Sequence, residues 1–380
     1  MTVTATELLG IPMTASARVD VYSGVSRMAG KVWGSLHRAP RPSRTAAVIV
    51  HPASNFLGHY LLEPLAARGV DAVGLTTRYL GNDSTLIMEN CVLDVGAAIA
   101  YLRERGYDHV VLIGNSGGGG LSAFFQSQAE APTVTCTPAG DPPDLTRASL
   151  APADALIQLM AHPGRALVFA DWIDPAVLDE HDPSRRDPEL DLFSGRVAPP
   201  YPPDFVAAYR AGQLARMRRI TAWVREQLAA LDAAGPGLSD LPFLVHGTTA
   251  DPRFLDVTLD PSDREPGTMW GPPQEANLMP ASLAHYSSLR SWLSQWSVDD
   301  SNAHGPRCLA RTSVPTLVMY GTAEQVCFPS YASAMYDAVP HDNKRLLPVA
   351  GGTHYLQGQP GHVAALADTV VAWLDEQGLR

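Results

Sequence analysis

The residues best suited to chemistry lie in the segment Gly114-Asn115-Ser116-Gly117-Gly118, which has the pattern Gly-x-Ser-x-Gly. The apolar run HVVLIG leads into this segment, and GGLSAFFQSQAE, which predicts a helix, follows it. A serine on a tight turn between a strand and a helix is exposed as a nucleophile, provided that small residues flank it. The glycines at 117–120 also allow the helix to pack closely against neighbouring backbone. We therefore predict that Ser116 is a nucleophile that attacks an acyl-type bond.

A serine hydroxyl needs a base that takes its proton, and the base needs a third group that orients it. Where the serine lies on such a turn, the acid follows it along the chain and the histidine follows the acid. His354 is the predicted base, because it lies in the glycine-rich segment GGTHYL just after the last predicted strand. His51 precedes the serine and is expected to shape its own loop instead.

Glu324 is the predicted acid, because it is the only carboxylate in GTAEQVCFP, the segment that follows the predicted strand PTLVMYG. Aspartate is the more usual acid at this place, so Glu324 must position its carboxylate with one additional methylene. Asp171 and Asp174, in the segment DWIDP beyond the predicted strand DALIQLMA, remain alternative acids.

The oxyanion formed during acyl transfer needs N–H donors, each of which contributes on the order of 3 kcal/mol. The amide of Gly117, directly after the nucleophile, is the first predicted donor. The second is expected from the loop after the strand AAVIV, which begins His51-Pro52-Ala53-Ser54. Because Pro52 has no N–H, the amide of Ala53 is the predicted donor and that of Ser54 is the alternative.

Short β-branched runs between turn residues predict the strands that must position these groups. They alternate with helical patterns, which indicates a mostly parallel sheet with right-handed crossovers. A helix capped by Asp83 or Ser84 is expected to end at Gly106, and a final helix to cover 361–377. An antiparallel pair is predicted upstream, from ARVDVYSG (17–24) and RMAGKVWGSLHR (27–38). The other predicted strands are 46–50, 71–78, 109–114, 154–161, 315–321 and 345–351.

The middle of the chain interrupts this alternation. It is rich in Pro, Asp and Trp, and it holds a long amphipathic helix that begins near Pro203 and continues past Leu231. An insertion of this length is unlike a single loop. We predict a core of residues 1–161 and 308–380, with residues 162–307 as a mainly helical cap over the carboxyl edge of the sheet.

These motifs together resemble the α/β-hydrolase superfamily, and in particular its cap-bearing serine hydrolases of esterase type, without indicating a subfamily. The resemblance covers residues of about 17–160 and 308–378 and depends on GNSGG, GTAE and GGTHY. It implies an α/β fold with a mostly parallel central sheet flanked by helices. The sequence departs from the usual pattern in two places, with HP for the usual HG at the oxyanion loop and Glu324 for the usual aspartate.

The identity of the nucleophile narrows the chemistry that the resemblance implies. Haloalkane dehalogenases and epoxide hydrolases of this fold use an aspartate, and enzymes similar to dienelactone hydrolase use a cysteine, whereas this chain has Ser116. The leading hypothesis is a hydrolase of a carboxylic ester, thioester or lactone. Hydrolysis of a carbon–carbon bond in ring-cleavage products by the same residues, or a non-catalytic ligand receptor on the same scaffold, are the alternatives. No cofactor and no metal are expected, and dipeptides such as His181-Asp182 lack the partners of a metal site.

Several aromatic residues of the insertion could line an apolar pocket for a small apolar or aromatic substrate, or they could form the insertion's own core. Arg78 follows a predicted strand and could reach a substrate carboxylate or form a structural salt bridge. The candidates for substrate binding are Trp270, Trp292, Trp296 and Tyr286, with Phe254 and Met269 beside them.

Composition limits the partners of the chain. Its 380 residues carry 28 basic and 39 acidic side chains, a net charge of −11, and no cluster of lysines and arginines. Neither nucleic acid nor a membrane is therefore an expected partner. The four scattered cysteines indicate free thiols in a reducing compartment, and the amino-terminal residues lack the pattern of a signal peptide. A cytoplasmic protein that acts on small molecules is expected, and the oligomeric state is left open.

Overall fold

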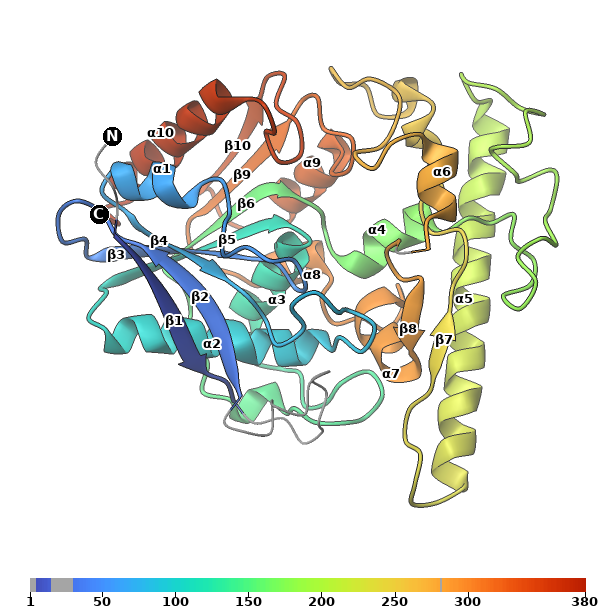
Figure 1. The fold of residues 1–380 in the computed structure, drawn as a ribbon, viewed down its shortest axis with the longest axis horizontal. Coiled ribbons are helices and arrows are strands. Elements are labelled where there is room, and N and C mark those ends of the chain that lie inside the picture. The colour runs from blue at the N-terminus through green and yellow to red at the C-terminus, as the bar shows by residue number, and fades with distance from the viewer. Residues whose placement is uncertain (1–4, 15–29, 281) are drawn as a thin grey trace.

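The computed structural model describes residues 5–14, 30–280 and 282–380. Within them, the central sheet has eight strands in the order β1-β2-β4-β3-β5-β6-β9-β10 (Figure 1). Strands β4, β3, β5, β6, β9 and β10 are parallel to one another, whereas β2 pairs antiparallel with both β1 and β4. This is the arrangement of the α/β-hydrolase fold, which the sequence predicted. The strands are β1 (Thr6–Pro12), β2 (Lys31–His37), β3 (Thr45–Val50), β4 (Asp71–Leu75), β5 (His109–Ser116), β6 (Ala155–Ala161), β9 (Thr316–Gly321) and β10 (Lys344–Val349).

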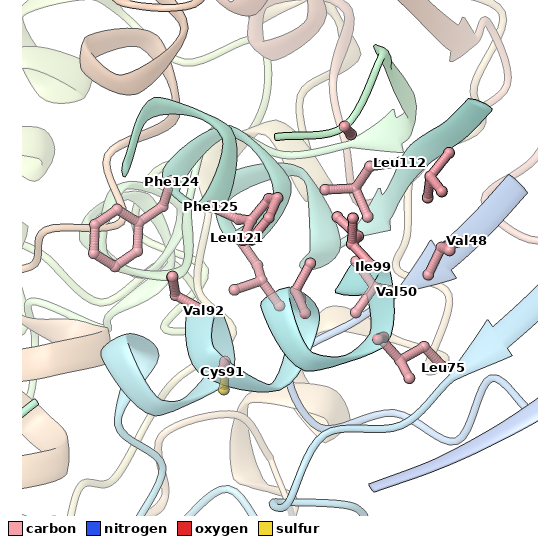
Figure 2. Packing of buried hydrophobic residues seen from close by; sticks show 14 of the residues in the cluster. Val48, Val50, Leu75, Cys91, Val92, Ile99, Leu112, Leu121, Phe124 and Phe125 are labelled. Atoms are coloured by element: carbon pink, nitrogen blue, oxygen red, sulfur yellow. The ribbon is translucent and has the colours of Figure 1, made fainter. Parts of the chain in front are cut away.

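Helices cover both faces of the sheet. Alternate residues of β3 point to opposite sides, so that Val48 belongs to one apolar cluster and Ile49 to the other. Figure 2 shows part of the first cluster, where α2, α3 and the sheet pack together. The first face is covered by α2 (Met88–Glu104), α3 (Gly118–Glu130), α8 (Gly305–Leu309) and α9 (Pro329–Ala338), and the second by α1 (Leu62–Ala67) and α10 (Pro360–Glu376). Within the described residues, every helix is too short or too polar to traverse a lipid bilayer.

Two local predictions need correction. The partner of β2 in the antiparallel pair is β1 (Thr6–Pro12), which the sequence did not predict. The predicted partner, 17–24, lies outside the described residues. The helix expected from Asp83 begins only at Met88, because the Asp83 carboxylate accepts from Arg165 and the Ser84 hydroxyl donates to Asn82 at 2.7 Å.

In the predicted insertion (162–307), helices alternate with long irregular segments, and Phe169, Met217 and Trp292 take part in an apolar cluster of its own. In Figure 1 it lies beside the sheet, with α5 farthest from it. Its last residues form α8, which packs against α3 of the sheet layer. The elements before α8 are α4 (Arg165–Trp172), α5 (Pro203–Ala233), β7 (Pro242–Leu244), α6 (Pro273–Leu278), β8 (Tyr286–Ser288), α7 (Leu289–Ser291) and a π-helical turn, Trp292–Trp296.

A buried polar network joins this π-helical turn to the start of α2. Glu89 accepts a hydrogen bond from the Ser294 hydroxyl at 2.8 Å and another from the Asn302 amide at 2.9 Å. The side-chain amide of Gln295 donates to the backbone oxygen of Asp83 at 2.6 Å. Burial raises the pKa of Glu89, and the hydrogen bonds from Asn302 and Ser294 oppose that shift. Separating the insertion from the core at this edge would therefore leave buried polar groups without hydrogen-bond partners.

Arg78 forms a structural salt bridge, the second of the two roles considered for it. Its guanidinium lies 2.7 Å from Asp94, and both side chains are fully buried. Arg78 also donates to the backbone oxygen of Thr14 at 3.1 Å, so the pair connects β4, α2 and the end of β1.

We expect Asp94→Asn to lower the free energy of unfolding by about 3–5 kcal/mol, because the guanidinium would remain buried without its counter-charge. Urea unfolding at neutral pH measures the change. The control is Asp299→Asn, which removes the exposed Arg218–Asp299 pair and should cost about 0–1 kcal/mol. Equal losses in the two variants would contradict a special role for the buried pair.

Candidate active site

Ser116 lies on a strained turn between β5 and α3. Its φ angle is 55°, in the left-handed region that side chains other than glycine rarely adopt. The turn is possible because neighbouring backbone comes very close: a Cβ on Gly118 would collide with the carbonyl oxygen of Val50, and one on Gly114 with the carbonyl of Gly118. Both glycines of the motif are therefore required by sterics, as the sequence predicted.

The structure brings Ser116, His354 and Glu324 together. The Oγ of Ser116 lies 2.9 Å from Nε2 of His354, and Nδ1 of the same ring lies 2.7 Å from Oε2 of Glu324. All three side chains are buried. The other carboxylate oxygen of Glu324 accepts from the amide of Val326 at 2.7 Å, so both of its oxygens are held.

Sheet topology explains why these residues meet. Ser116, Glu324 and His354 stand at or just after the ends of β5, β9 and β10, which are parallel. The carboxyl ends of parallel strands lie at one edge of a sheet, so loops distant in sequence converge there. His51 and His162 reach the same edge from the ends of β3 and β6.

Neither alternative acid takes the place of Glu324. Asp171 accepts hydrogen bonds from Arg253 and from the Tyr331 hydroxyl, each at 2.6 Å. Asp174 lies 3.0 Å from the guanidinium of Arg186, within the insertion. Both carboxylates are engaged with arginines, whereas Glu324 contacts the His354 ring.

The loop after β3 differs from the expectation for the second oxyanion donor. The amides of Ala53 and Ser54 both donate to Nδ1 of His51, at 3.1 and 2.8 Å. These two N–H groups therefore bind within their own loop. A ring nitrogen that accepts two hydrogen bonds carries no proton, so the neutral ring has its proton on Nε2.

The Nε2 edge of His51 lies against the turn of Ser116. A Cβ on Gly117 would be 2.6 Å from this nitrogen, and no described residue accepts a hydrogen bond from it. Burial, and after it the positive charge of Arg165, holds the pKa of His51 well below its usual range. His51 thus presents a neutral N–H donor beside the amide of Gly117.

A cavity of about 240 Å³ opens beside Ser116 and His354. At one end its wall is polar, with His51, His162 and Arg165. The remainder is mostly apolar and comes largely from the insertion. The other lining residues are Ser54, Val168, Phe169, Trp172, Met269, Trp270, Leu283, Trp296, Val326 and Tyr355.

Two of the four predicted substrate-binding residues line this cavity, Trp270 and Trp296. The prediction was wrong for Trp292, whose ring is buried in the insertion and donates from Nε1 to Thr221 at 2.9 Å. It was also wrong for Tyr286, which is 53% exposed on the short strand β8 and lines a different hollow.

Sequence reasoning missed the contribution of the segment after β6. His162 and Arg165 form part of the polar wall, and Phe169 and Trp172 of α4 part of the apolar wall. Their position just beyond the carboxyl end of a central strand was the available signal. Tyr355, next to His354, was also missed, and burial raises the pKa of its phenol to about 12.

Among the described residues, metal-ligating side chains cluster in one place, at Glu324, Cys327 and His354. His354 and one oxygen of Glu324 are already paired with each other, and the other oxygen accepts from Val326. Burial raises the pKa of the Cys327 thiol well above its usual range, which disfavours the thiolate that binds metal. The donor set thus suits a hydrogen-bonded pair better than a metal ion.

No protein-family model matches the sequence, and no curated protein matches it either. Among solved structures, DcsB in complex with its substrate analogue aligns over 98% of this chain and 99% of its own, at 11% identity and a TM-score of 0.52. The esterase domain of a Rhodothermus marinus protein aligns over 97% and 98%, at 10% identity and a TM-score of 0.48. The monoacylglycerol lipase of Paleococcus ferrophilus aligns over 90% and 99%, at 15% identity and a TM-score of 0.44. At such identities, similarity to DcsB shows a shared fold and leaves the reaction undetermined.

A buried histidine, His59, supports the turn of Ser116 from behind. Nδ1 of His59 accepts from the amide of Leu61 at 3.3 Å, and Nε2 donates to the side-chain oxygen of Asn115 at 3.0 Å. Asn115 in turn donates to the carbonyl of Leu159 at 2.7 Å, so His59 supports the residue before the nucleophile. Burial lowers the pKa of His59 to about 4 and that of His162 to about 3.

Because the folded-state pKa of His59 is below its unfolded value of about 6.5, the unfolded chain binds more protons between these two values. The free energy of unfolding should therefore fall as pH is lowered from 6.5 toward 4, by up to about 1.4 kcal/mol per pH unit for each such histidine. In His59→Gln this slope should decrease by about 1 kcal/mol per pH unit. Urea unfolding between pH 7.5 and 4.5 gives the slope, and the values at pH 7.5 give the separate packing cost. If the pH dependence of the free energy of unfolding is the same in His59→Gln as in wild type, the lowered pKa of His59 is refuted.

Proposed function

We propose that this α/β-hydrolase-fold chain is a serine hydrolase that cleaves a carboxylic ester, thioester or lactone of a small substrate with an apolar or aromatic body. The observation that carries the proposal is the chain of contacts from Ser116 Oγ to His354 Nε2 at 2.9 Å and from His354 Nδ1 to Glu324 Oε2 at 2.7 Å. A serine, an imidazole and a carboxylate in this order form a nucleophile with its base and the group that orients the base.

The geometry supports a two-step reaction. Ser116 Oγ attacks the carbonyl carbon while its proton passes to Nε2 of His354. The imidazolium then protonates the leaving alcohol, thiol or hydroxyl, and an acyl group remains on Ser116. A water molecule, deprotonated by His354, releases the acid and restores the serine. Glu324 accepts from Nδ1–H throughout, which orients the ring and stabilises its charged form.

We assign the oxyanion site to the amide of Gly117 and to Nε2–H of His51. The amides of Ala53 and Ser54 already donate to Nδ1 of His51, whereas Nε2 has no acceptor among the described residues and lies against Gly117. An imidazole donor also suits the HP sequence of this loop, because Pro52 can supply no N–H.

We further propose that residues 162–307 act as the cap and that 1–161 and 308–380 form the catalytic core. The core supplies Ser116, Glu324 and His354, while the insertion supplies most of the apolar wall of the cavity. A cavity of about 240 Å³ suits a small substrate. Trp296 and Trp270 would contact its apolar part, which retains two of the predicted substrate contacts.

A fluorophosphonate probe tests the proposed nucleophile, because it labels only serines activated by a base and an oxyanion site. We expect one adduct, on Ser116, by intact mass and peptide mapping, and none in Ser116→Ala. His354→Ala should reduce both labelling and turnover of 4-nitrophenyl esters by at least about 10³-fold. A folded protein that gives no adduct and no turnover would reject the proposal. Turnover of vinylogous diketones but not of esters would indicate a carbon–carbon hydrolase instead.

Two substitutions of His51 distinguish the contributions of its two ring nitrogens. Asn offers an acceptor near the position of Nδ1 and no donor near that of Nε2, while Gln offers a donor near Nε2. We expect His51→Asn to lower kcat by about 10²–10³-fold with a small change in KM, because only the transition state loses a hydrogen bond. His51→Gln should retain more activity than His51→Asn. If His51→Asn is more active than His51→Gln, or if its kcat is near that of wild type, the second oxyanion donor is the Ala53 or Ser54 amide instead.

A further inference from the structure

Arg165 lies in the wall of the same cavity as Ser116 and His354. It is the first residue of α4, and only 4% of its side chain is exposed. Its guanidinium carbon lies 4.3 Å from the centre of the Trp296 ring, which holds the planar group against an aromatic face.

The hydrogen bonds of Arg165 are incomplete. One terminal nitrogen, Nη2, pairs with Asp83, while the other, Nη1, is buried and has no acceptor among the described residues. Arg216 shows the contrast within the same chain: it bonds Glu180 through Nε at 2.9 Å, the Asp174 carbonyl through Nη1 and the His246 carbonyl through Nη2, both at 2.7 Å. A guanidinium has five N–H donors, and an unmatched buried one is costly.

The unmatched atoms around the cavity are all of one kind. Besides Nη1 of Arg165, the indole nitrogens of Trp172 and Trp296 are buried and have no partner in the described part of the chain. All three are N–H donors, and all three residues line the cavity. Each of these atoms is itself covered by protein atoms, so an acceptor oxygen in the cavity reaches one of them only where a side chain shifts.

The charges of the residues that line the cavity indicate which kind of ligand it favours. The described lining residues include no aspartate or glutamate, and the only permanent cation among them is Arg165. Its charge lowers the pKa of His51 and of His162, in each case after the larger effect of burial.

We infer that Arg165 binds a carboxylate of the substrate, so that the preferred substrates are esters that carry a negative charge in addition to the bond that is cleaved. This inference rests on the proposed hydrolase function and adds the substrate class. A carboxylate matches the donors of a guanidinium, and Trp296 then lies beside the apolar part of the same molecule.

Two 4-nitrophenyl esters with the same glutaryl chain and different charge test this inference: 4-nitrophenyl hydrogen glutarate and its neutral methyl ester. We expect wild-type protein to favour the anion in kcat/KM. Arg165→Met keeps an unbranched apolar chain against Trp296 and should lower the ratio of anion to neutral kcat/KM by about 10- to 100-fold. Arg165→Lys, which keeps the charge, should lower the ratio less.

Arg218→Met is the matched control, because it also removes one positive charge from the insertion, at a side chain that is 59% exposed. It should leave the ratio within about twofold of wild type. A ratio that is the same in wild type, Arg165→Met and Arg218→Met would overturn the inference, since Arg165 would then be only structural.

A binding measurement separates this inference from the proposed function. Calorimetry with Ser116→Ala should show tighter binding of 4-nitrobenzoate than of 4-nitrobenzamide, and adding Arg165→Met should remove the difference. If neither ester is turned over and Ser116 is not labelled while this preference persists, the hydrolase function fails and the carboxylate site stands. Turnover of both esters without any preference for charge, in kinetics or in binding, would reject the site and leave the function.

Discussion

The steric constraint on the turn at Ser116 governs the rest of the site. Its φ of 55° persists only because Gly114 and Gly118 let the turn pack against the carbonyl of Val50. The same packing fixes the hydroxyl at the carboxyl edge of the sheet, within reach of His354. Stored strain of this kind costs on the order of 1–3 kcal/mol, and the surrounding sheet must outweigh it. The Asn115–His59 contact behind the turn contributes to that support.

Desolvation gives the site its electrostatic character. The histidine at the end of β6 is buried and the one at the end of β3 is partly buried, and the pKa of each is lowered first by burial and then by the charge of Arg165, so both are neutral donors or acceptors at neutral pH. His354, the proposed base, has the carboxylate of Glu324 against its Nδ1. Three imidazoles line one cavity, and we propose separate roles for them that depend on their neighbours: His354 moves a proton, His51 supplies a donor, and His162 lines the wall.

Much of the fold and the centre of the site could be predicted from the sequence, because both follow from local signals. Ser116, Glu324 and His354 each stand at or directly after an apolar strand, and parallel topology then brings them together. The partners of the Ala53 and Ser54 amides could not be read in this way, because composition does not reveal which ring nitrogen a loop amide meets. Trp292 and Trp296 are four residues apart, yet only the second lines the cavity, and the π-helical turn between them departs from the usual helical period. The cap boundaries stay a prediction.

The network around Glu89 has a consequence for substrate entry. Ser294, Gln295 and Asn302 bind the core through buried polar groups, and separating them would leave a carboxylate and an amide without partners. Met269 and Trp270 differ from these residues, because they line the cavity and are 39% and 37% exposed. We therefore expect a small molecule to reach Ser116 past Met269 and Trp270, while the side of the insertion that is bonded to Glu89 stays in place.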